Sequence, residues 1–282
     1  MRSFLFAPAS RERFVRNFAK QAADAYCIDL EDGTAAADKD AARADLPALV
    51  AKLREGALSG LLFVRINDPA SPLGQADLAA CAGLALDGLA IPKVAAPDDL
   101  RRLAPALDAA AQRLGKRWMI VAILESVAGI ANARAIAAAA APGCALAFGA
   151  EDFATEMGAR RTPEGIEVLH ARSEVVLAAR LHGLAALDQV VVEVRDDGRF
   201  AADAKAGRDL GYDGKMCLTP RQVEQANAAF APSAEEVAQA RRLLAAFETA
   251  GKGARGAIDF EGRMVDAPLA ERARRLLAKA GG

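Results

Sequence analysis

Three short acidic runs follow apolar stretches of the sequence and are the residues best suited to chemistry. They are Asp29-Leu30-Glu31-Asp32, Glu125-Ser126 and Gly149-Ala150-Glu151-Asp152. Carboxylates gathered without His or Cys suit a hard divalent cation, and Mg²⁺ takes one or two of them together with waters and substrate oxygens. Glu125 and Asp152 are the simplest ligand pair. Asp29, Glu31 and Asp32 could orient metal-bound waters. A single carboxylate could equally cap a helix or pair with arginine, but three such runs favour a magnesium site.

Arg65 ends another apolar stretch. Its guanidinium could bind a planar carboxylate through two parallel hydrogen bonds, or it could form a structural ion pair with Asp29 or Glu31. Mg²⁺ beside an arginine suits a 2-oxo acid, because the metal can chelate the keto and carboxylate oxygens while the arginine holds the carboxylate. Such a site stabilises an enolate or a developing alkoxide. The expected reaction makes or breaks a carbon–carbon bond next to a carbonyl.

Other catalytic chemistries find less support in the sequence. The two histidines, His170 and His182, lie in a predicted outer helix and not at a strand end, which argues against a histidine base. No G-x-S-x-G elbow or Walker loop is present, so a hydrolase triad and a P-loop are not indicated. Lys93 and Lys215 lie near strand ends and keep Schiff-base chemistry open.

Eight apolar, β-rich runs, each followed by a stretch with helical spacing, would position these residues. The runs are Ser3–Ala9, Tyr26–Glu31, Leu61–Asn67, Gly88–Val94, Trp118–Ser126, Ala145–Asp152, Gln189–Val194 and Gly214–Pro220. Continuous apolar runs are typical of parallel strands covered on both faces. Eight βα units in about 250 residues predict an α/β fold, the (β/α)₈ TIM barrel, whose active sites lie at the C-terminal ends of the strands. An open doubly wound sheet is disfavoured, because Pro8-Ala9-Ser10-Arg11 stands where its G-x-G-x-x-G loop would be.

Helix signals divide the chain into a barrel catalytic domain, residues 1–230, and a C-terminal helical extension with a lid tail, residues 231–282. Within the barrel, helices are predicted to begin at Pro97-Asp98-Asp99, at Thr162-Pro163-Glu164 and at Pro220. In the extension, Ser233-Ala234-Glu235-Glu236 caps a helix that runs to about Ala250. The Gly-rich residues 251–256 form a hinge before a short segment, Ala257–Asp266, and a final helix, Ala267–Ala280.

Composition sets further limits on function. Of the 282 residues, 53% are hydrophobic and 26% are charged, which is typical of a globular protein. Lys and Arg number 36 against 37 Asp and Glu, so no basic surface for nucleic acid is expected. No apolar run approaches the roughly 20 residues of a membrane span, and the N-terminal apolar run is too short for a signal peptide. The cysteines are expected to be buried and reduced, as in the cytoplasm; they are Cys27, Cys81, Cys144 and Cys217.

The chain resembles the HpcH/HpaI aldolase/citrate lyase family, in particular its branch like the citrate lyase β subunit. The matching stretches are RSFLFAPAS, AYCIDLEDGTAAADKDAAR, VRIND, LAIPKV, ILESVAGI, AFGAEDF, RTPEGIEVLHARSEVVLAAR, GYDGKMCLTPRQV and GRMVDAP. They follow the family's order over nearly the full chain. The resemblance implies a Mg²⁺-binding barrel that cleaves citryl-CoA, malyl-CoA or citramalyl-CoA to an acyl-CoA and a 2-oxo acid. It also implies a homotrimer or hexamer.

The resemblance carries roles onto residues of this chain. Glu125 and Asp152 look like the metal ligands, and Arg65 looks like the residue that holds the substrate carboxylate. A further set is expected to complete the site: Asp29 and Glu31 as catalytic residues, and Gly149, Ala150 and Glu151 as substrate-binding residues. Asp266 is similar to a tail aspartate that closes the site of a neighbouring subunit and acts as a general acid–base. The alternative is a structural role in which Asp266 only caps the last helix.

The chain also departs from the family pattern. Thr219 stands where relatives often have His, and Glu193 stands where they commonly have Asp, so the acyl group is left open. Two other functions remain open as well. One is an aldolase that acts on free 2-oxo acids without CoA. The other is a non-catalytic subunit that needs a partner, such as an acyl-carrier subunit.

Overall fold

The computed structural model describes residues 1–56, 58–251 and 256–281. The chain divides into two compact units, Met1–Phe230 and Ala231–Gly282, and each is described by itself. No helix within the described residues is long and apolar enough to cross a membrane.

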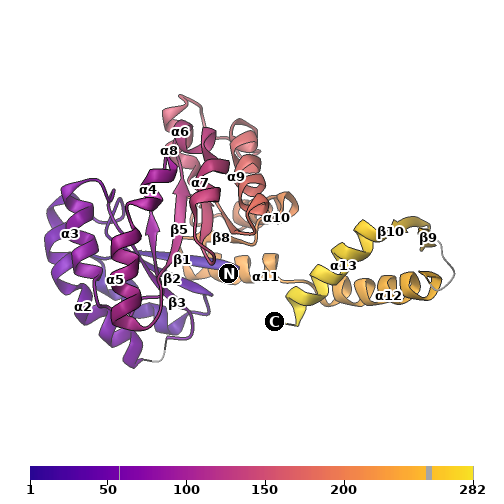
Figure 1. The fold of residues 1–282 in the computed structure, drawn as a ribbon, viewed down its shortest axis with the longest axis horizontal. Coiled ribbons are helices and arrows are strands. Elements are labelled where there is room, and N and C mark those ends of the chain that lie inside the picture. The colour runs from indigo at the N-terminus through magenta and orange to yellow at the C-terminus, as the bar shows by residue number, and fades with distance from the viewer. Residues whose placement is uncertain (57, 252–255, 282) are drawn as a thin grey trace. The chain divides into compact units, whose positions relative to one another are not determined.

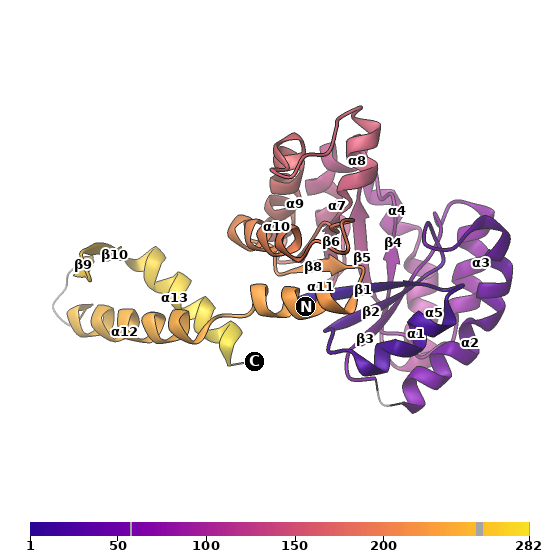
Figure 2. The ribbon, with the colours of Figure 1, turned by 180° about the vertical axis from the view of Figure 1, so that it is seen from behind.

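The first unit is a closed barrel of eight parallel strands in sequence order, with β1 paired to both β2 and β8 (Figure 1). The strands are β1 Ser3–Pro8, β2 Ala25–Asp29, β3 Leu61–Arg65, β4 Gly88–Ile91, β5 Met119–Leu124, β6 Ala145–Phe148, β7 Ala185–Asp188 and β8 Gly214–Cys217. Helices surround the strands on the outside (Figures 1 and 2). The (β/α)₈ TIM barrel predicted from the sequence is confirmed.

The outer layer of this unit consists of helices and short 3-10 turns that connect successive strands. The helices are α1 Glu12–Arg16, α2 Lys39–Glu55, α3 Pro72–Cys81, α4 Pro97–Arg101, α5 Ala104–Leu114, α6 Val127–Ala131, α7 Ala133–Ala139, α8 Ala150–Glu156, α9 Leu169–Leu181, α10 Asp197–Leu210 and α11 Pro220–Phe230. The 3-10 turns are η1 Asn17–Lys20, η2 Ala36–Asp38 and η3 Ile166–Val168. The predicted helix starts at Pro97 and Pro220 are confirmed.

Alternation along the strands separates two buried layers. One core lies inside the barrel and includes Phe4, Cys27, Phe63, Ile123 and Met216. A larger core lies between the strands and the helices. Because successive strand residues point to opposite sides, the next inward positions after Cys27, Phe63 and Ile123 belong to three polar residues. These are Asp29, Arg65 and Glu125, which are thereby placed at the C-terminal mouth.

Each predicted strand differs from the observed one in at least one bound, and the differences are largest for the sixth and seventh strands. The sixth strand ends at Phe148 and not at Asp152, because α8 begins at Ala150. The seventh strand is Ala185–Asp188 and not Gln189–Val194. The apolar run after Asp188 leaves the sheet, and its Val192 and Val194 are 49% and 43% exposed. Hydrophobicity alone therefore placed the seventh strand too late.

The helix predicted to begin at Thr162-Pro163-Glu164 was also wrong. That stretch forms a turn in which the Thr162 hydroxyl accepts a hydrogen bond from the Gly165 amide and donates one to Glu167. A side chain bonded to the local backbone competes with helix formation. The helix α9 begins only at Leu169, after η3.

The four cysteines are free and buried, as the sequence predicted. Burial raises the pKa of the Cys217 thiol to about 12, and it raises that of Cys27 and Cys81 as well. Because the thiolate is the reactive form, burial makes these thiols poor nucleophiles.

The second unit comprises α12 Ala234–Gly251, the antiparallel strands β9 Ala257–Phe260 and β10 Arg263–Asp266, and α13 Ala267–Ala280 (Figure 1). Both predicted helices are confirmed. Ser233 and Glu236 form a reciprocal cap at the start of α12, with hydrogen bonds of 2.8 and 3.1 Å. The short segment before α13 is a β-hairpin, which turns at Glu261 and Gly262 with φ values of 52° and 77°. Most of the predicted hinge, residues 252–255, lies outside the described residues.

Candidate active site

The polar strand ends of the first unit line a cavity of about 420 Å³. Its walls come from β1, β2, β3, β5, β8, the start of α8 and the loop after β7. The lining residues are Phe6, Pro8, Asp29, Gly33, Arg65, Ile123, Glu125, Gly149, Ala150, Glu151, Asp152, Val190, Val192, Met216 and Leu218. Among the barrel residues given metal, catalytic or substrate roles from the sequence, Glu31 and Asp32 are outside this lining, and Glu31 contacts Arg65. The charged lining residues come mainly from the ends of β2, β3 and β5 and from α8, and the apolar ones mainly from β1, β8 and the loop after β7.

Arg65 and Asp29 form a bidentate ion pair across the ends of β3 and β2. Nε of Arg65 donates to Oδ1 of Asp29 at 2.8 Å, and Nη2 donates to Oδ2 at 2.6 Å. The backbone amides of Glu31 and Gly33 donate to the same two oxygens, each at 2.9 Å. The Asp29 carboxylate is thus fully engaged in orienting Arg65 and the loop after β2.

The Arg65 guanidinium keeps donors for a further acceptor. Nη1 lies 3.2 Å from Oε2 of Glu31, and the guanidinium carbon is 5.3 Å from the centre of the Phe6 ring. Arginine has five N–H donors; contacts with Asp29 and Glu31 account for three of them. Burial opposes the charged form, but hydrogen bonding and charge from Asp29 raise the pKa of Arg65. The side chain is therefore a fixed, charged group at the cavity.

Lys93 bridges two of the acidic groups, a role that the sequence did not indicate. Its Nζ is 2.8 Å from Oε1 of Glu31 and 3.8 Å from Oδ2 of Asp32. Its backbone amide donates to Oε1 of Glu125 at 2.7 Å. Lys93 has φ 53°, a left-handed conformation that costs a non-glycine residue roughly 1–2 kcal/mol. This strained turn after β4 aims the amide at Glu125.

Glu125 is a buried carboxyl group at the cavity whose pKa is raised above its ordinary value. Its side chain is 5% exposed. Burial first, and then the nearby charge of Asp152, raise the pKa of Glu125 to about 8, against the opposing hydrogen bond from Lys93. A positive charge beside both carboxylates would offset this repulsion.

The end of β6 leaves space beside Glu125. A Cβ atom at Gly149 would lie 2.4 Å from Oε2 of Glu125, so glycine keeps that oxygen open. Asp152 is exposed and belongs to the first turn of α8. Asp152 was predicted to end the sixth strand and lies instead at the start of α8, where it still lines the cavity.

This donor set fits Mg²⁺. Among the described residues, no group of three or more His, Cys, Asp or Glu side chains is arranged as a metal cage. Mg²⁺ does not require one, since it keeps waters and substrate oxygens beside one or two carboxylates. Glu125 and Asp152 supply such a pair, and the gap at Gly149 leaves one oxygen of Glu125 accessible.

Glu151 is held in place by an arginine that the sequence analysis missed. Nε of Arg161 donates to Oε1 of Glu151 at 2.9 Å, and its Nη1 donates to Glu167 at 2.5 Å. Nη2 donates to the Gln189 side chain at 3.1 Å. Arg161 precedes the Thr162 turn. In such a turn the sequence has no periodic pattern that would distinguish an arginine bound to Glu151 from an arginine on the surface.

The two lysines that left Schiff-base chemistry open do not fit it. Hydrogen bonding to Glu31 raises the pKa of Lys93, which disfavours the neutral amine. Lys215 is fully buried and points away from the barrel interior. Its Nζ donates to Asp188 at 2.9 Å, to the Gln189 carbonyl at 2.6 Å and to Asp203. Schiff-base formation needs an accessible neutral amine.

A second, apolar pocket of about 250 Å³ adjoins the cavity and shares Phe6, Pro8 and Leu218 with it. Its other walls include Phe14, Phe18 and Thr219, from α1, η1 and the turn after β8. Thr219, the residue that departs from the family pattern, therefore lies in this pocket. Glu193, the other departure, is exposed in the loop after β7.

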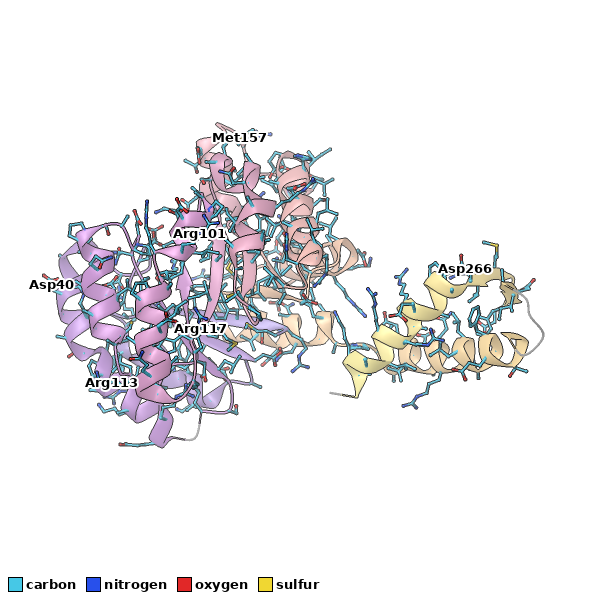
Figure 3. The ribbon with its side chains drawn as sticks, in the orientation of Figure 1. Asp40, Arg101, Arg113, Arg117, Met157 and Asp266 are labelled. Carbon is cyan, nitrogen blue, oxygen red and sulfur yellow. The ribbon has the colours of Figure 1, made fainter. Side chains whose placement is uncertain are left out.

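The remaining predicted residues lie elsewhere. His170 and His182 are exposed on and just after α9, as the sequence predicted. Asp266 lies in the second unit, at the junction of β10 and α13 (Figure 3). Its Oδ1 accepts a hydrogen bond from the Leu269 amide at 3.3 Å, so it caps α13.

The fold and cavity define a TIM-barrel protein whose active-site candidates are carboxylates and one arginine at the strand ends. Residues 2–220 match the model of the family described as HpcH/HpaI aldolase/citrate lyase, and the chain belongs to this family. It is 44% identical to a citrate lyase subunit beta-like protein of Deinococcus radiodurans, over 99% of this chain and 96% of that one. It is 36% identical to a (3S)-malyl-CoA thioesterase of Cereibacter sphaeroides, over 99% and 94%.

Among solved structures, the chain is similar to CitE of Mycobacterium tuberculosis in complex with magnesium, acetoacetate and coenzyme A. The TM-score is 0.82 at 34% identity, over 99% of this chain and 98% of that one. The family resemblance noted from the sequence is therefore confirmed.

Proposed function

We propose that the protein is a Mg²⁺-dependent carbon–carbon lyase that cleaves a 3-hydroxy-dicarboxylyl-CoA thioester to an acyl-CoA and a 2-oxo acid. The observation that carries the proposal is one cavity that joins a fixed arginine, Arg65, to the carboxylate pair of Glu125 and Asp152. CitE of M. tuberculosis, which is similar over almost the whole chain, binds magnesium and coenzyme A.

Arg65 would bind the carboxylate next to the reacting carbon. Asp29 orients its guanidinium through two hydrogen bonds, and two donors remain for a substrate carboxylate. Asp29 and Glu31 are proposed to act by holding this orientation. Because neighbouring carboxylates already hold the Arg65 side chain in place, the side chain would need little rearrangement when the substrate binds.

Glu125 and Asp152 would hold Mg²⁺, with Gly149, Ala150 and Glu151 lining the substrate beside it. When bound, the ion would polarise the oxygen that becomes the keto group. During cleavage the hydroxyl proton would pass to water, the carbon–oxygen double bond of the 2-oxo acid would form, and the carbon–carbon bond would break. The electron pair of that bond would form the acyl-CoA enolate. Protonation of that enolate carbon completes the acyl-CoA product.

The apolar pocket beside the cavity would accept the thioester arm. It is lined by Phe6, Phe14, Phe18 and Leu218, which suit a chain that is largely uncharged near the thioester. Thr219 in this pocket is a candidate for setting the preferred acyl group.

The second unit would complete the site of a neighbouring subunit in a homotrimer or hexamer. Residues 1–230 would then be the catalytic domain and residues 231–282 the lid, with Asp266 as the acid that protonates the enolate carbon. We expect the protein to act in the cytoplasm, since its four cysteines are free thiols.

Thioester hydrolysis is the second candidate function, because a relative that is 36% identical is a (3S)-malyl-CoA thioesterase. A lyase releases an acyl-CoA and a 2-oxo acid in equal amounts. A thioesterase releases free CoA and a dicarboxylic acid. An aldolase without CoA would instead cleave the free hydroxy acid.

Incubation of the purified protein with malyl-CoA and with citramalyl-CoA, with Mg²⁺ or with EDTA, separates these reactions. We expect acetyl-CoA together with glyoxylate or pyruvate, in equal amounts and only with Mg²⁺. Free malate and citramalate serve as the substrates for the aldolase alternative. Release of free CoA without acetyl-CoA would establish the thioesterase instead. Folded protein that turns over none of these compounds would contradict the lyase and favour a partner-dependent subunit.

A further inference from the structure

Lys39 is a buried lysine next to the candidate active site that has no role in the proposed chemistry. It is the first residue of α2 and is 9% exposed. Its Nζ donates to the carbonyl oxygens of Leu30 and Glu31, each at 2.9 Å, and to Oδ1 of Asn67 at 2.6 Å. Within the described part of the chain, no carboxylate lies within ion-pair distance of this ammonium. Its three N–H donors are satisfied by neutral oxygens alone.

The acceptors of Lys39 belong to the ends of two neighbouring strands. Leu30 and Glu31 follow β2, and Asn67 lies two residues beyond Arg65, the last residue of β3. The Asn67 amide nitrogen also donates to the Leu30 carbonyl at 3.0 Å. Lys39 and Asn67 together therefore connect the strand that carries Asp29 to the strand that carries Arg65.

This connection is anchored in the helical layer. The backbone and side-chain nitrogens of Asn67 donate to Oδ2 of Asp77 on α3, at 2.8 and 2.6 Å. Oδ1 of Asp77 accepts from Nε of Arg43 on α2 at 2.9 Å. Asp77 is fully buried. Nη2 of Arg43 is buried without a hydrogen-bond partner, whereas Lys39, Asn67 and Asp77 are joined by the bonds above. Buried polar groups that are paired favour one arrangement, because leaving a member unpaired is costly.

We propose that Lys39 is a positioning residue that fixes Glu31, and through it the orientation of Arg65. This inference rests on the proposed function, in which Arg65 binds the carboxylate of the 2-oxo acid. Lys39 holds the Glu31 carbonyl, while the Glu31 carboxylate contacts Nη1 of Arg65 at 3.2 Å and Nζ of Lys93 at 2.8 Å. Without the ammonium, the loop after β2 loses its support, and Arg65 loses one of the two carboxylates that orient it.

Kinetics of the condensation direction distinguish positioning from a general loss of structure. In Lys39→Met we expect the KM for the 2-oxo acid to rise by about 10–100-fold, the range for residues that orient a ligand-binding group. The KM for the acyl-CoA should stay at the wild-type value, since the apolar pocket is built from other elements. Lys39→Gln retains two donors and should lie between Lys39→Met and the wild type. Lys52→Met is the matched control on α2, because Lys52 has a half-exposed side chain.

A second readout does not need activity. Hydrogen–deuterium exchange of the ligand-free protein should show faster exchange in the peptide that covers residues 30–34 of Lys39→Met. The amides of Glu31 and Gly33 are bonded to Asp29 there. Exchange in the other barrel strands should match that of the wild type, and Lys52→Met should match it throughout.

Two results would overturn the proposal. One is unchanged exchange at residues 30–34 in both Lys39 variants. The other is faster exchange throughout the barrel with a lower kcat and unchanged KM values, which would make Lys39 a general stability residue. If Lys39→Met does not fold, Lys39→Gln decides by the same two measurements. If the wild-type protein has no lyase activity, the proposed function fails, and the exchange experiment still tests whether Lys39 fixes the loop.

Discussion

Gly149 lies so close to Glu125 that a Cβ atom on residue 149 would be 2.4 Å from Oε2 of Glu125. Gly149 directly follows β6 and Glu125 directly follows β5, two strands that pair in the barrel. Contacts below 3.0 Å between such atoms require something to shift. The buried carboxylate therefore depends on glycine at its neighbour for its position and for access to its second oxygen.

Gly149→Ala should weaken Mg²⁺ binding by at least about tenfold, because the new methyl group displaces the carboxylate of a proposed ligand. Isothermal titration calorimetry with Mg²⁺ measures the change. Gly198→Ala is the control, since a Cβ there meets its nearest neighbour at an ordinary 3.5 Å. Wild-type Mg²⁺ affinity in Gly149→Ala would show that the ion does not bind beside Glu125.

Glu125→Gln should abolish Mg²⁺ binding and activity while the melting temperature stays equal or rises. The amide oxygen can still accept the hydrogen bond from the Lys93 backbone, and the buried charge that repels Asp152 is removed. Calorimetry and thermal unfolding give the two quantities. Unchanged Mg²⁺ affinity would contradict the assignment of Glu125, and a large fall in melting temperature would make its role structural.

The barrel and much of its mouth were predictable because eight apolar runs, each followed by a stretch with helical spacing, can be recognised in the sequence. Alternation places Asp29, Arg65 and Glu125 two residues beyond apolar inward positions, so their meeting follows from the eight-strand pattern alone. Asp152 was assigned to a strand and lies on α8. The prediction that it lies near Glu125 still held, because both a strand end and a following first helical turn lie at the same mouth.

Residues whose roles depend on loop conformation were not predictable. Lys93 matters through a left-handed backbone and an amide hydrogen bond, and no sequence period encodes either. Asp188 was missed because the seventh strand was placed at the more hydrophobic run that follows it. Asp188 is fully buried against Arg172 and Lys215, a pairing between residues far apart in sequence.

Arg65→Lys should lower kcat/KM by a factor that corresponds to about 2–4 kcal/mol, the range for truncating a buried charge pair. Lysine keeps the positive charge. It lacks the planar guanidinium, which in Arg65 pairs with Asp29 and has two further N–H donors for the substrate. Steady-state kinetics with the preferred thioester measure the loss. Arg101→Lys, at an exposed position (Figure 3), should behave as wild type. Near-normal turnover in Arg65→Lys would leave Arg65 as a structural ion-pair partner only.

Asp203→Asn should reduce the free energy of unfolding by about 3–5 kcal/mol at pH 7, as expected when one partner of a buried ion pair is removed. Burial alone would raise the pKa of Asp203, but the charges of Lys215 and Arg172 lower it below its ordinary value. A carboxylate with a lowered folded-state pKa stabilises the protein above its unfolded pKa of about 3.9, and this contribution is lost as pH falls further.

The difference between wild type and Asp203→Asn should therefore be constant above about pH 5 and shrink below about pH 4. Denaturant titrations across this range measure it. Asp209→Asn, on the same helix α10, removes an exposed pair with Lys205 and should change stability by less than about 1 kcal/mol. A difference that stays constant down to the acid transition would show that Asp203 is not ionised in the folded protein.

The proposed lid role of Asp266 predicts complementation between two inactive variants, Glu125→Gln and Asp266→Asn. If each site takes Glu125 from one chain and Asp266 from a neighbour, random mixing leaves about a quarter of the sites with both residues intact, because each is present on half of the chains. Mixed oligomers should regain activity in that proportion, measured after native mass spectrometry confirms subunit exchange. If both residues act within one chain, every site keeps one lesion, and no activity returns. Asp266 also caps α13, and Asn is an equally good cap, so Asp266→Asn should preserve the helix. Full activity of Asp266→Asn alone would reduce Asp266 to that capping role.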